Sequence, residues 1–166
     1  ICHALYGGDA AHWVGPGTGV EGDALTNKIR VVEESVILHK AVLTDGLEIL
    51  RCFGGREMAA ICGAIISARL SRIPVVLDGY VACTAAAVLH ALDEHALDHC
   101  LVAHVSAEPG HRHLIEKLGK EALFDFGMRL GEASGAALSI SILRSAAACH
   151  SGMATFEEAA VSNKNS

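Results

Sequence analysis

Apolar residues recur at helical spacing through the early part of the chain. The clearest series is Leu25, Ile29, Val32 and Val36. Steps of three and four residues place these side chains on one face of a helix, so we predict a helix over about 24–43 with Asp23 as its cap. Asp45 predicts the start of a shorter helix, which ends at the Gly54-Gly55 pair.

Two short apolar runs predict buried parallel strands. The run 73–78 ends in a carboxylate, Asp78, and the run 100–104 has the same character. A helical segment over about 80–94 lies between them and is long enough to cross over from one strand to the next. The two strands are therefore predicted to be parallel neighbours.

The remaining segments follow from turn and cap signals. The Gly-rich segment 7–23 is predicted to be a loop. A helix is predicted over about 56–71, and Pro109 suits the first turn of another helix over about 109–118. An apolar helix over about 135–150 precedes a polar tail.

Composition favours an α/β fold without nucleic acid. Hydrophobic residues make up 51% of the chain but aromatic residues only 4%, so small aliphatic side chains must pack helices closely on a sheet. Lys and Arg number 13 against 19 Asp and Glu, for a formal charge of −6. Nucleic acid is not an expected partner, because neutralising phosphates requires clustered Lys and Arg. A small phosphorylated ligand needs only one cation and a few backbone N–H groups.

No membrane partner is expected either. Arg69, Asp78 and Arg144 interrupt the longest apolar stretches before they reach the roughly 18–20 residues of a membrane span. The first residues, Ile1 to Leu5, do not resemble a signal peptide. We expect a cytoplasmic protein.

Cysteine and histidine patterns do not predict a disulfide framework or a metal site. The cysteines are Cys2, Cys52, Cys62, Cys83, Cys100 and Cys149, with no C-x-x-C pair. Most lie in apolar surroundings and are predicted to be reduced and buried. The ten histidines include His95 and His99 in a polar stretch, predicted to lie at the surface, but no zinc motif is present and we expect no metal.

Polar loops follow both predicted strands. In parallel α/β sheets ligands bind at the carboxyl ends of strands, which here carry Asp78-Gly79 and the run from Ser106 to His111. The second loop opens a helix whose free N–H groups suit a phosphate. The alternative is an ordinary helix start with Ser106 and Glu108 as caps.

Three further features are candidates for an anion-binding site or a general base. Gly15-Pro16-Gly17-Thr18-Gly19 allows the backbone to approach a phosphate, and Lys28 is either its charge partner or a solvated helix residue. Glu132 lies among small residues near the start of the last helix. It is a candidate general base if it is desolvated, or a carboxylate stabilised by the helix dipole.

Six ordered motifs give the chain a specific resemblance. They are Trp13-Val14-Gly15-x-Gly17-Thr18-Gly19, Gly54-Gly55-x-Glu57-x-Ala59-Ala60, Ile73-Pro74-Val75-Val76-Leu77-Asp78-Gly79, His104-x-Ser106-x-Glu108-Pro109-Gly110-His111, Gly127-Met128-Arg129-Leu130-Gly131-Glu132-x-Ser134-Gly135-Ala136 and Met153-Ala154-Thr155-Phe156. Together they resemble the carboxyl-terminal half of the nicotinate-nucleotide–dimethylbenzimidazole phosphoribosyltransferases, which build the lower ligand of cobalamin.

The resemblance implies a reaction and a set of site residues. Nicotinate mononucleotide and 5,6-dimethylbenzimidazole would give α-ribazole 5′-phosphate and nicotinate. Glu132 matches the family's general base, and Lys28 and Ser106 match its phosphate site. The nucleotide site is expected to include Gly17, Thr18, Gly19, Asp78 and Gly79 as well, and the benzimidazole site Met128, Arg129 and Leu130.

The resemblance also implies an architecture. We expect a Rossmann-like parallel sheet flanked by helices, a carboxyl-terminal helix belonging to a small helical domain, no cofactor and a homodimer. Residues 1–166 are expected to be one α/β domain, the carboxyl-terminal part of a longer enzyme whose amino-terminal portion completes the base pocket. The alternative is a truncated, non-catalytic relative that binds a nucleotide or a full-length partner.

Overall fold

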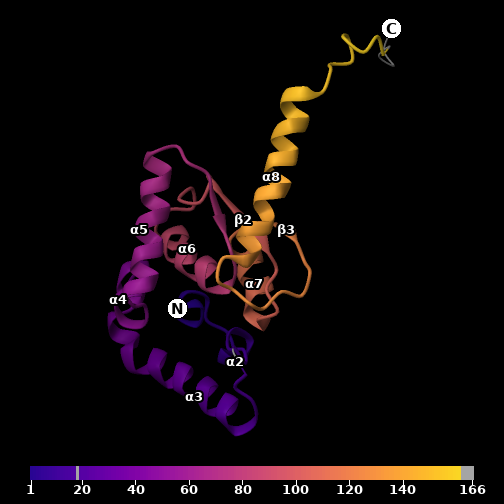
Figure 1. The fold of residues 1–166 in the computed structure, drawn as a ribbon. Coiled ribbons are helices and arrows are strands. Elements are labelled where there is room, and N and C mark those ends of the chain that lie inside the picture. Colours follow the sequence, from indigo (N-terminus) through magenta and orange to yellow (C-terminus); the bar gives the residue numbers. More distant parts are fainter. Residues whose placement is uncertain (18, 162–166) are drawn as a thin grey trace.

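The centre of the fold is a three-stranded parallel sheet. A computed structural model describes residues 1–17 and 19–161. Its strands lie in the order β1 (Val75–Leu77), β2 (Cys100–His104) and β3 (Ala122–Phe124) (Figure 1). Val75 pairs with Cys100 and Val102 with Ala122. The prediction that the first two strands are parallel neighbours is confirmed, and the chain has the expected α/β fold.

Helices make up most of the remaining described residues. They are α1 (Cys2–Tyr6), α2 (Ala10–Trp13), α3 (Gly22–His39), the 3₁₀ helix η1 (Lys40–Val42), α4 (Gly46–Phe53), α5 (Arg56–Leu70), α6 (Tyr80–Leu92), α7 (Pro109–Lys117) and α8 (Ser134–Gly152). Asp45 accepts hydrogen bonds from the N–H groups of Leu47 and Glu48, so its predicted role as a cap is confirmed. Pro109 opens α7 as expected.

Two details of the amino-terminal segment differ from the prediction. The segment 7–23 is not all loop, because Asp9 caps α2 by accepting a 2.8 Å hydrogen bond from Ala11 N–H. The indole of Trp13 is buried and donates to the Gly7 carbonyl, which stabilises this short helix. Asp23 does not cap α3, since the helix begins at Gly22 and Asp23 lies inside its first turn.

Strand β3 was not predicted from the pattern. It has three half-buried residues, too few for a period-two alternation to stand out. The strand forms because β2 offers it a parallel partner, as His104 pairs with Phe124. A long-range contact therefore decides this element.

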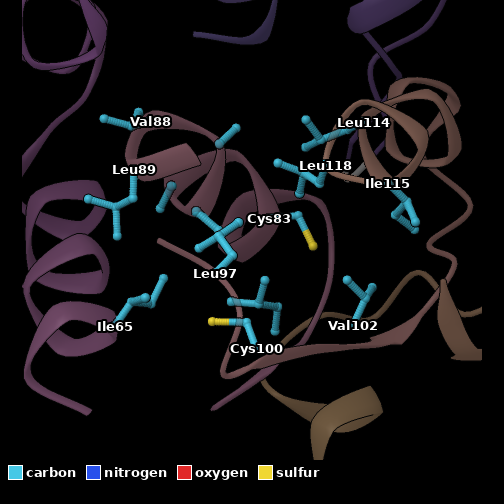
Figure 2. Close-up of a cluster of buried hydrophobic side chains, with 14 of the residues drawn as sticks. Ile65, Cys83, Val88, Leu89, Leu97, Cys100, Val102, Leu114, Ile115 and Leu118 are labelled. Carbon is cyan, nitrogen blue, oxygen red and sulfur yellow. The ribbon is translucent and has the colours of Figure 1, made fainter. Parts of the chain in front are cut away.

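Helix α6 lies at the centre of the core (Figure 2). Its completely buried side chains are Cys83, Ala85, Ala86, Ala87 and Val88. Ile65 of α5, Val102 of β2 and Leu114 of α7 pack against this helix in one cluster. Small side chains let the neighbouring elements approach closely, which explains how a chain poor in aromatic residues packs.

The thiols and the paired histidines only partly match the prediction. All six cysteines are unpaired, as expected. Cys149 is exposed and Cys52 half-buried, because both lie on outward faces of their helices, so they are not the buried thiols that the sequence predicted. His99 is also not at the surface, since it is half-buried and its Nε2 lies 3.0 Å from the Ile65 carbonyl oxygen.

Helix α8 packs on the sheet only through its first turns. This end contacts β2 and β1, and the remainder projects away from the body of the molecule (Figure 1). Apolar side chains on the projecting helix are partly exposed, among them Leu138, Ile140 and Ile142. Its membership in a separate small helical domain stays a prediction. Among residues 1–17 and 19–161, no helix is both long and apolar enough to cross a membrane.

Candidate functional site: four loops that meet

The Gly-rich loop before α3 is held by the ammonium group of Lys28. Its Nζ donates a 2.7 Å hydrogen bond to the Gly15 carbonyl and lies close to Gly17. Gly17 and Gly19 have φ values of +57° and +123°, a region that favours glycine. Lys28 is therefore placed at the loop, as a phosphate partner would be. Thr18, predicted for the same site, lies outside the described residues.

The same loop packs tightly against the start of α7. A Cβ at Gly15 would overlap the Glu108 carboxylate and lie 2.7 Å from the Pro109 ring. Any larger residue at this position would displace the loop or the helix start. Gly15 is therefore a packing glycine that joins the first loop to the exit of β2.

The loop after β2 is ordered by hydrogen bonds around Ser106. Ser106 Oγ accepts from Glu108 N–H at 3.2 Å in a local turn just before α7. Glu108 occupies the N-cap position of α7 but its side chain makes no capping hydrogen bond, so the alternative with Ser106 and Glu108 as caps is wrong. Ser106 N–H donates to His111 Nδ1 at 2.9 Å. Burial lowers the pKa of His111 to about 4, with the charge of His104 adding to the decrease and Asp78 opposing it. His111 is thus a neutral acceptor at neutral pH.

The loop 127–131 joins the other two. Ala107 N–H donates a 2.9 Å hydrogen bond to the Met128 carbonyl, and Arg129 Nη2 donates one of the same length to the Gly17 carbonyl. Met128 is half-buried, whereas Leu130 is largely exposed. The residues predicted for base binding therefore lie beside those predicted for the nucleotide.

The fourth loop, after β1, is tied to α8 rather than left free. One oxygen of Asp78 accepts a 2.8 Å hydrogen bond from Ala136 N–H, in the first turn of that helix. Helix N-termini leave such N–H groups without intrahelical partners, so Asp78 serves as a remote cap. Gly79 packs against the His104 ring, where a Cβ would lie at 3.5 Å. Both residues lie at the carboxyl end of β1, the edge at which parallel α/β sheets bind their ligands. Asp78 has a structural task there, because it caps α8.

Glu132 lies at the entrance to α8 in an unusual backbone conformation. Glu132 and Ala133 have φ values of +54° and +59°, which cost about 1 kcal/mol or more for residues with a side chain. Ser134 N–H closes the turn by donating to the Gly131 carbonyl at 2.9 Å. The Glu132 side chain is exposed. The dry environment that a general base requires is therefore not formed by the described residues alone.

Sequence reasoning missed two buried histidines beneath these loops. His104 and His111 are 1% and 0% exposed, and their ring centroids lie 6.2 Å apart at a steep angle. Both belong to the motif that was singled out after β2, but only its serine was assigned a role. A histidine that ends an otherwise apolar strand was the available signal for His104.

The four loops form a cluster at the carboxyl edge of the sheet. Two cavities of about 220 and 390 Å³ lie elsewhere, one beneath α1–α3 and the other along the β3 edge, and no predicted site residue lines either. Within the described ranges, no three His, Cys, Asp or Glu side chains are grouped to hold a metal ion.

Comparison with known proteins gives a consistent assignment. The chain is 61% identical over 165 residues to a nicotinate-nucleotide–dimethylbenzimidazole phosphoribosyltransferase from Rhizobium rhizogenes, covering 99% of this chain and 49% of that protein. A protein of the same name from Methylocella silvestris is 59% identical over 164 residues, covering 99% and 48%. The chain thus spans about half the length of the curated relatives it matches.

A solved structure shares the fold. The crystal structure of CobT from Thermus thermophilus superimposes with a TM-score of 0.87 at 37% identity, over 97% of this chain and 48% of that one. A family model described as phosphoribosyltransferase matches residues 1–161. The loops that meet at the sheet edge all lie within this match. The chain therefore belongs to this phosphoribosyltransferase family.

Proposed function

We propose that this chain provides the nucleotide-binding half of an enzyme that transfers phosphoribose from nicotinate mononucleotide to 5,6-dimethylbenzimidazole. The products are α-ribazole 5′-phosphate and nicotinate, in cobalamin biosynthesis. The proposal is supported by the names of the relatives that match nearly the whole chain. Within the fold, the observation that supports it is the hydrogen bond from Arg129 to Gly17, which joins the proposed base loop to the proposed nucleotide loop.

The proposed chemistry needs little acid catalysis. Nicotinate leaves as the bond between ribose C1′ and its positively charged pyridinium nitrogen breaks, so the leaving group needs no proton. One benzimidazole nitrogen forms the new bond to C1′ from the opposite face, which inverts β to α. The proton on the other nitrogen passes to the Glu132 carboxylate, a general-base contribution of typically 10²–10⁴-fold, order of magnitude.

The nucleotide phosphate is assigned to the cluster around Ser106. Lys28, the Ser106 hydroxyl and the backbone of Gly17 and Gly19 supply the polar groups, with Asp78 and Gly79 at the margin. Thr18 belongs to the same motif and stays a prediction for this site. Met128, Arg129 and Leu130 border the benzimidazole. Glu132 is exposed in this chain, which spans about half the length of its relatives. The desolvation that makes this carboxylate an effective base is therefore assigned to the bound benzimidazole together with the rest of the enzyme.

We also propose that the enzyme is a cytoplasmic homodimer. The partly exposed Leu138, Ile140 and Ile142 on α8 offer an apolar surface of the kind that subunit contacts cover. Six unpaired cysteines suit a reducing compartment.

Replacing Glu132 with Gln tests the proposed function in the protein at its natural length. The amide keeps the size of the side chain but does not take up a proton, so turnover should fall by about 10²-fold or more. Binding of nicotinate mononucleotide, measured by calorimetry, should be unchanged. Glu157→Gln, at an exposed acid outside the four loops, is the control and should retain full turnover. Normal turnover in E132Q would refute the role of Glu132 as general base. Absence of turnover in the unaltered protein would refute the proposed phosphoribosyltransferase activity.

A further inference from the structure

His111 is buried completely, yet only one of its ring nitrogens has a partner. Its Nδ1 accepts the 2.9 Å hydrogen bond from Ser106 N–H, so the proton of the neutral ring must reside on Nε2. Nε2 is buried and has no hydrogen-bond partner among the described residues. A buried N–H without a partner is unfavourable, so this histidine is not explained as a residue that merely fills the core. The nitrogen that accepts from Ser106 indicates a role in that contact instead.

His104 supports His111 from the sheet side. Its ring lies edge-on to His111, and its Nδ1 is 4.0 Å from the Asp78 carboxylate. A Cβ at Gly135 would overlap the His104 ring, so α8 presses directly on this side chain. The His111 ring therefore packs edge-on against a side chain that α8 itself contacts.

The Ser106 N–H lies between two anchored neighbours and has the His111 ring as its partner, while Val105 N–H donates to the Phe124 carbonyl at 3.0 Å. Ser106 is the second residue after β2, and the next N–H, that of Ala107, is bonded to the Met128 carbonyl on the opposite loop. The Ser106 hydroxyl accepts a hydrogen bond from Glu108 N–H. The direction in which this hydroxyl points therefore also depends on where the Ser106 backbone lies. The contact with His111 orients the one N–H between these two anchors, that of Ser106 itself.

We infer that His111, braced by His104, is a positioning residue that aims Ser106 at the phosphate of the bound nucleotide. The inference rests on the proposed function, which assigns Ser106 to the phosphate. His111 itself does not touch substrate. It acts by ordering the backbone N–H of Ser106. This effect depends on the acceptor atom Nδ1 and not on the bulk of the ring.

Two variants distinguish the contribution of the acceptor atom of His111 from the contribution of its bulk. In His111→Asn the side-chain oxygen is attached to Cγ, as Nδ1 is in histidine, so the acceptor is kept. In His111→Gln the amide lies one bond further out, in the place of Nε2, and the acceptor for Ser106 is lost. Both variants remove the ring and leave an amide in the core. Asn is one methylene smaller than Gln, so any loss from reduced packing falls more heavily on H111N, which is opposite to the expected effect on Ser106.

The first measurement is hydrogen exchange of the Ser106 amide, followed by NMR, which does not depend on any activity. Exchange should stay slow in H111N and become about tenfold faster or more in H111Q, as expected for the loss of one hydrogen bond. Equal exchange rates in the two variants would overturn the inference.

The second measurement is steady-state kinetics of the protein at its natural length. The KM for nicotinate mononucleotide should rise about tenfold in H111Q and stay within about threefold of the original in H111N, with a smaller change in kcat. Ile115→Val trims a buried neighbour on the same helix and should leave the Ser106 amide and the KM unchanged. A normal KM in H111Q would overturn the inference about His111. The proposed function is tested separately, by turnover in the unaltered protein.

Discussion

Arg129 donates a 2.9 Å hydrogen bond from Nη2 to the carbonyl oxygen of Gly17, across a sequence separation of 112 residues. The contact closes the loop that follows β3 over the Gly-rich loop that precedes α3. It is exposed to solvent, so its contribution to global stability is small, in the range of about 0–1 kcal/mol. Its main consequence is local, because it sets the distance between the proposed base and nucleotide sites.

Arg129→Ala should therefore weaken nucleotide binding without unfolding the protein. We expect the KM for nicotinate mononucleotide to rise several-fold, roughly 3–10-fold, because the Gly17 loop loses a charged donor that orders it. The melting temperature should change little. Arg51→Ala is the control, since Arg51 is exposed and pairs with Glu48 on α4, away from the four loops. An equal effect of both variants would show that overall charge and not this contact matters.

Asp78→Ala should destabilise the protein through α8. The variant loses a charged acceptor from an N–H group at the helix start, which costs about 1–2 kcal/mol, to be measured by urea unfolding. Asp78→Asn keeps an acceptor oxygen and should recover most of that loss. Asp45→Ala removes a comparable cap from α4, away from the site, and should lower stability without changing nucleotide affinity. A stability loss in D78A much smaller than that in D45A would contradict the capping role.

Stability should fall as the pH drops from about 6.5 towards 4. The pKa of His111 is lowered from 6.5 to about 4 in the folded protein, so over this interval the unfolded chain binds a proton that the folded one does not. The contribution is fully present above pH 6.5 and is lost as the pH approaches 4. At pH 5 the loss amounts to about 2 kcal/mol.

The pH effect is isolated by comparison with His111→Asn. The groups that face His111 are His104 from β2, which lowers its pKa, and Asp78 beyond β1, which raises it, while the neighbouring Tyr80 ring from α6 is uncharged at these pH values. Denaturant unfolding at pH 7 and pH 5 should show a larger drop for the unaltered protein than for H111N. Parallel pH profiles would mean that His111 does not titrate as described.

Ala133→Gly should stabilise the protein by about 0.5–1.5 kcal/mol. Ala133 has a φ of +59° before α8, where a Cβ is unfavourable and glycine is not. Ala137→Gly, in the interior of the same helix, is the matched control and should destabilise by about 1 kcal/mol. Thermal unfolding of the two variants should therefore shift in opposite directions, and a loss of stability in A133G would show that the left-handed conformation is not present.

The local elements were largely predictable because their signals are local. Leu25 to Val36 carry a helical period, Asp45 caps its own helix, and the runs that end at Asp78 and His104 are apolar and bounded by polar loops. The predicted secondary structure was wrong where burial or pairing with distant residues decides whether an element forms. Trp13 buries its indole and stabilises α2 inside an apparent loop, and β3 depends on β2 for its hydrogen bonds.

The candidate site was predictable as a set of motifs but not as an arrangement. Lys28 of α3 and Arg129 of the loop 127–131 donate to backbone carbonyls of the Gly-rich loop, and the Ser106 N–H donates to the His111 side chain. Such contacts between side chain and backbone have no signature in the spacing of residues. The task of Asp78 as a cap for α8 was equally hidden, because Ala136 is far away along the chain.

By itself, the sequence determined that this chain is an α/β protein with polar loops after its strands and a family-specific series of glycine and acidic motifs. Periodicity and capping act over a few residues, so they are legible in one dimension. Tertiary structure alone decided that four loops meet, that His104 and His111 are buried beneath them and that Glu132 stands exposed in a left-handed turn. Those outcomes depend on which surfaces exclude water once the helices pack on the sheet, a property of the assembled fold and not of any segment.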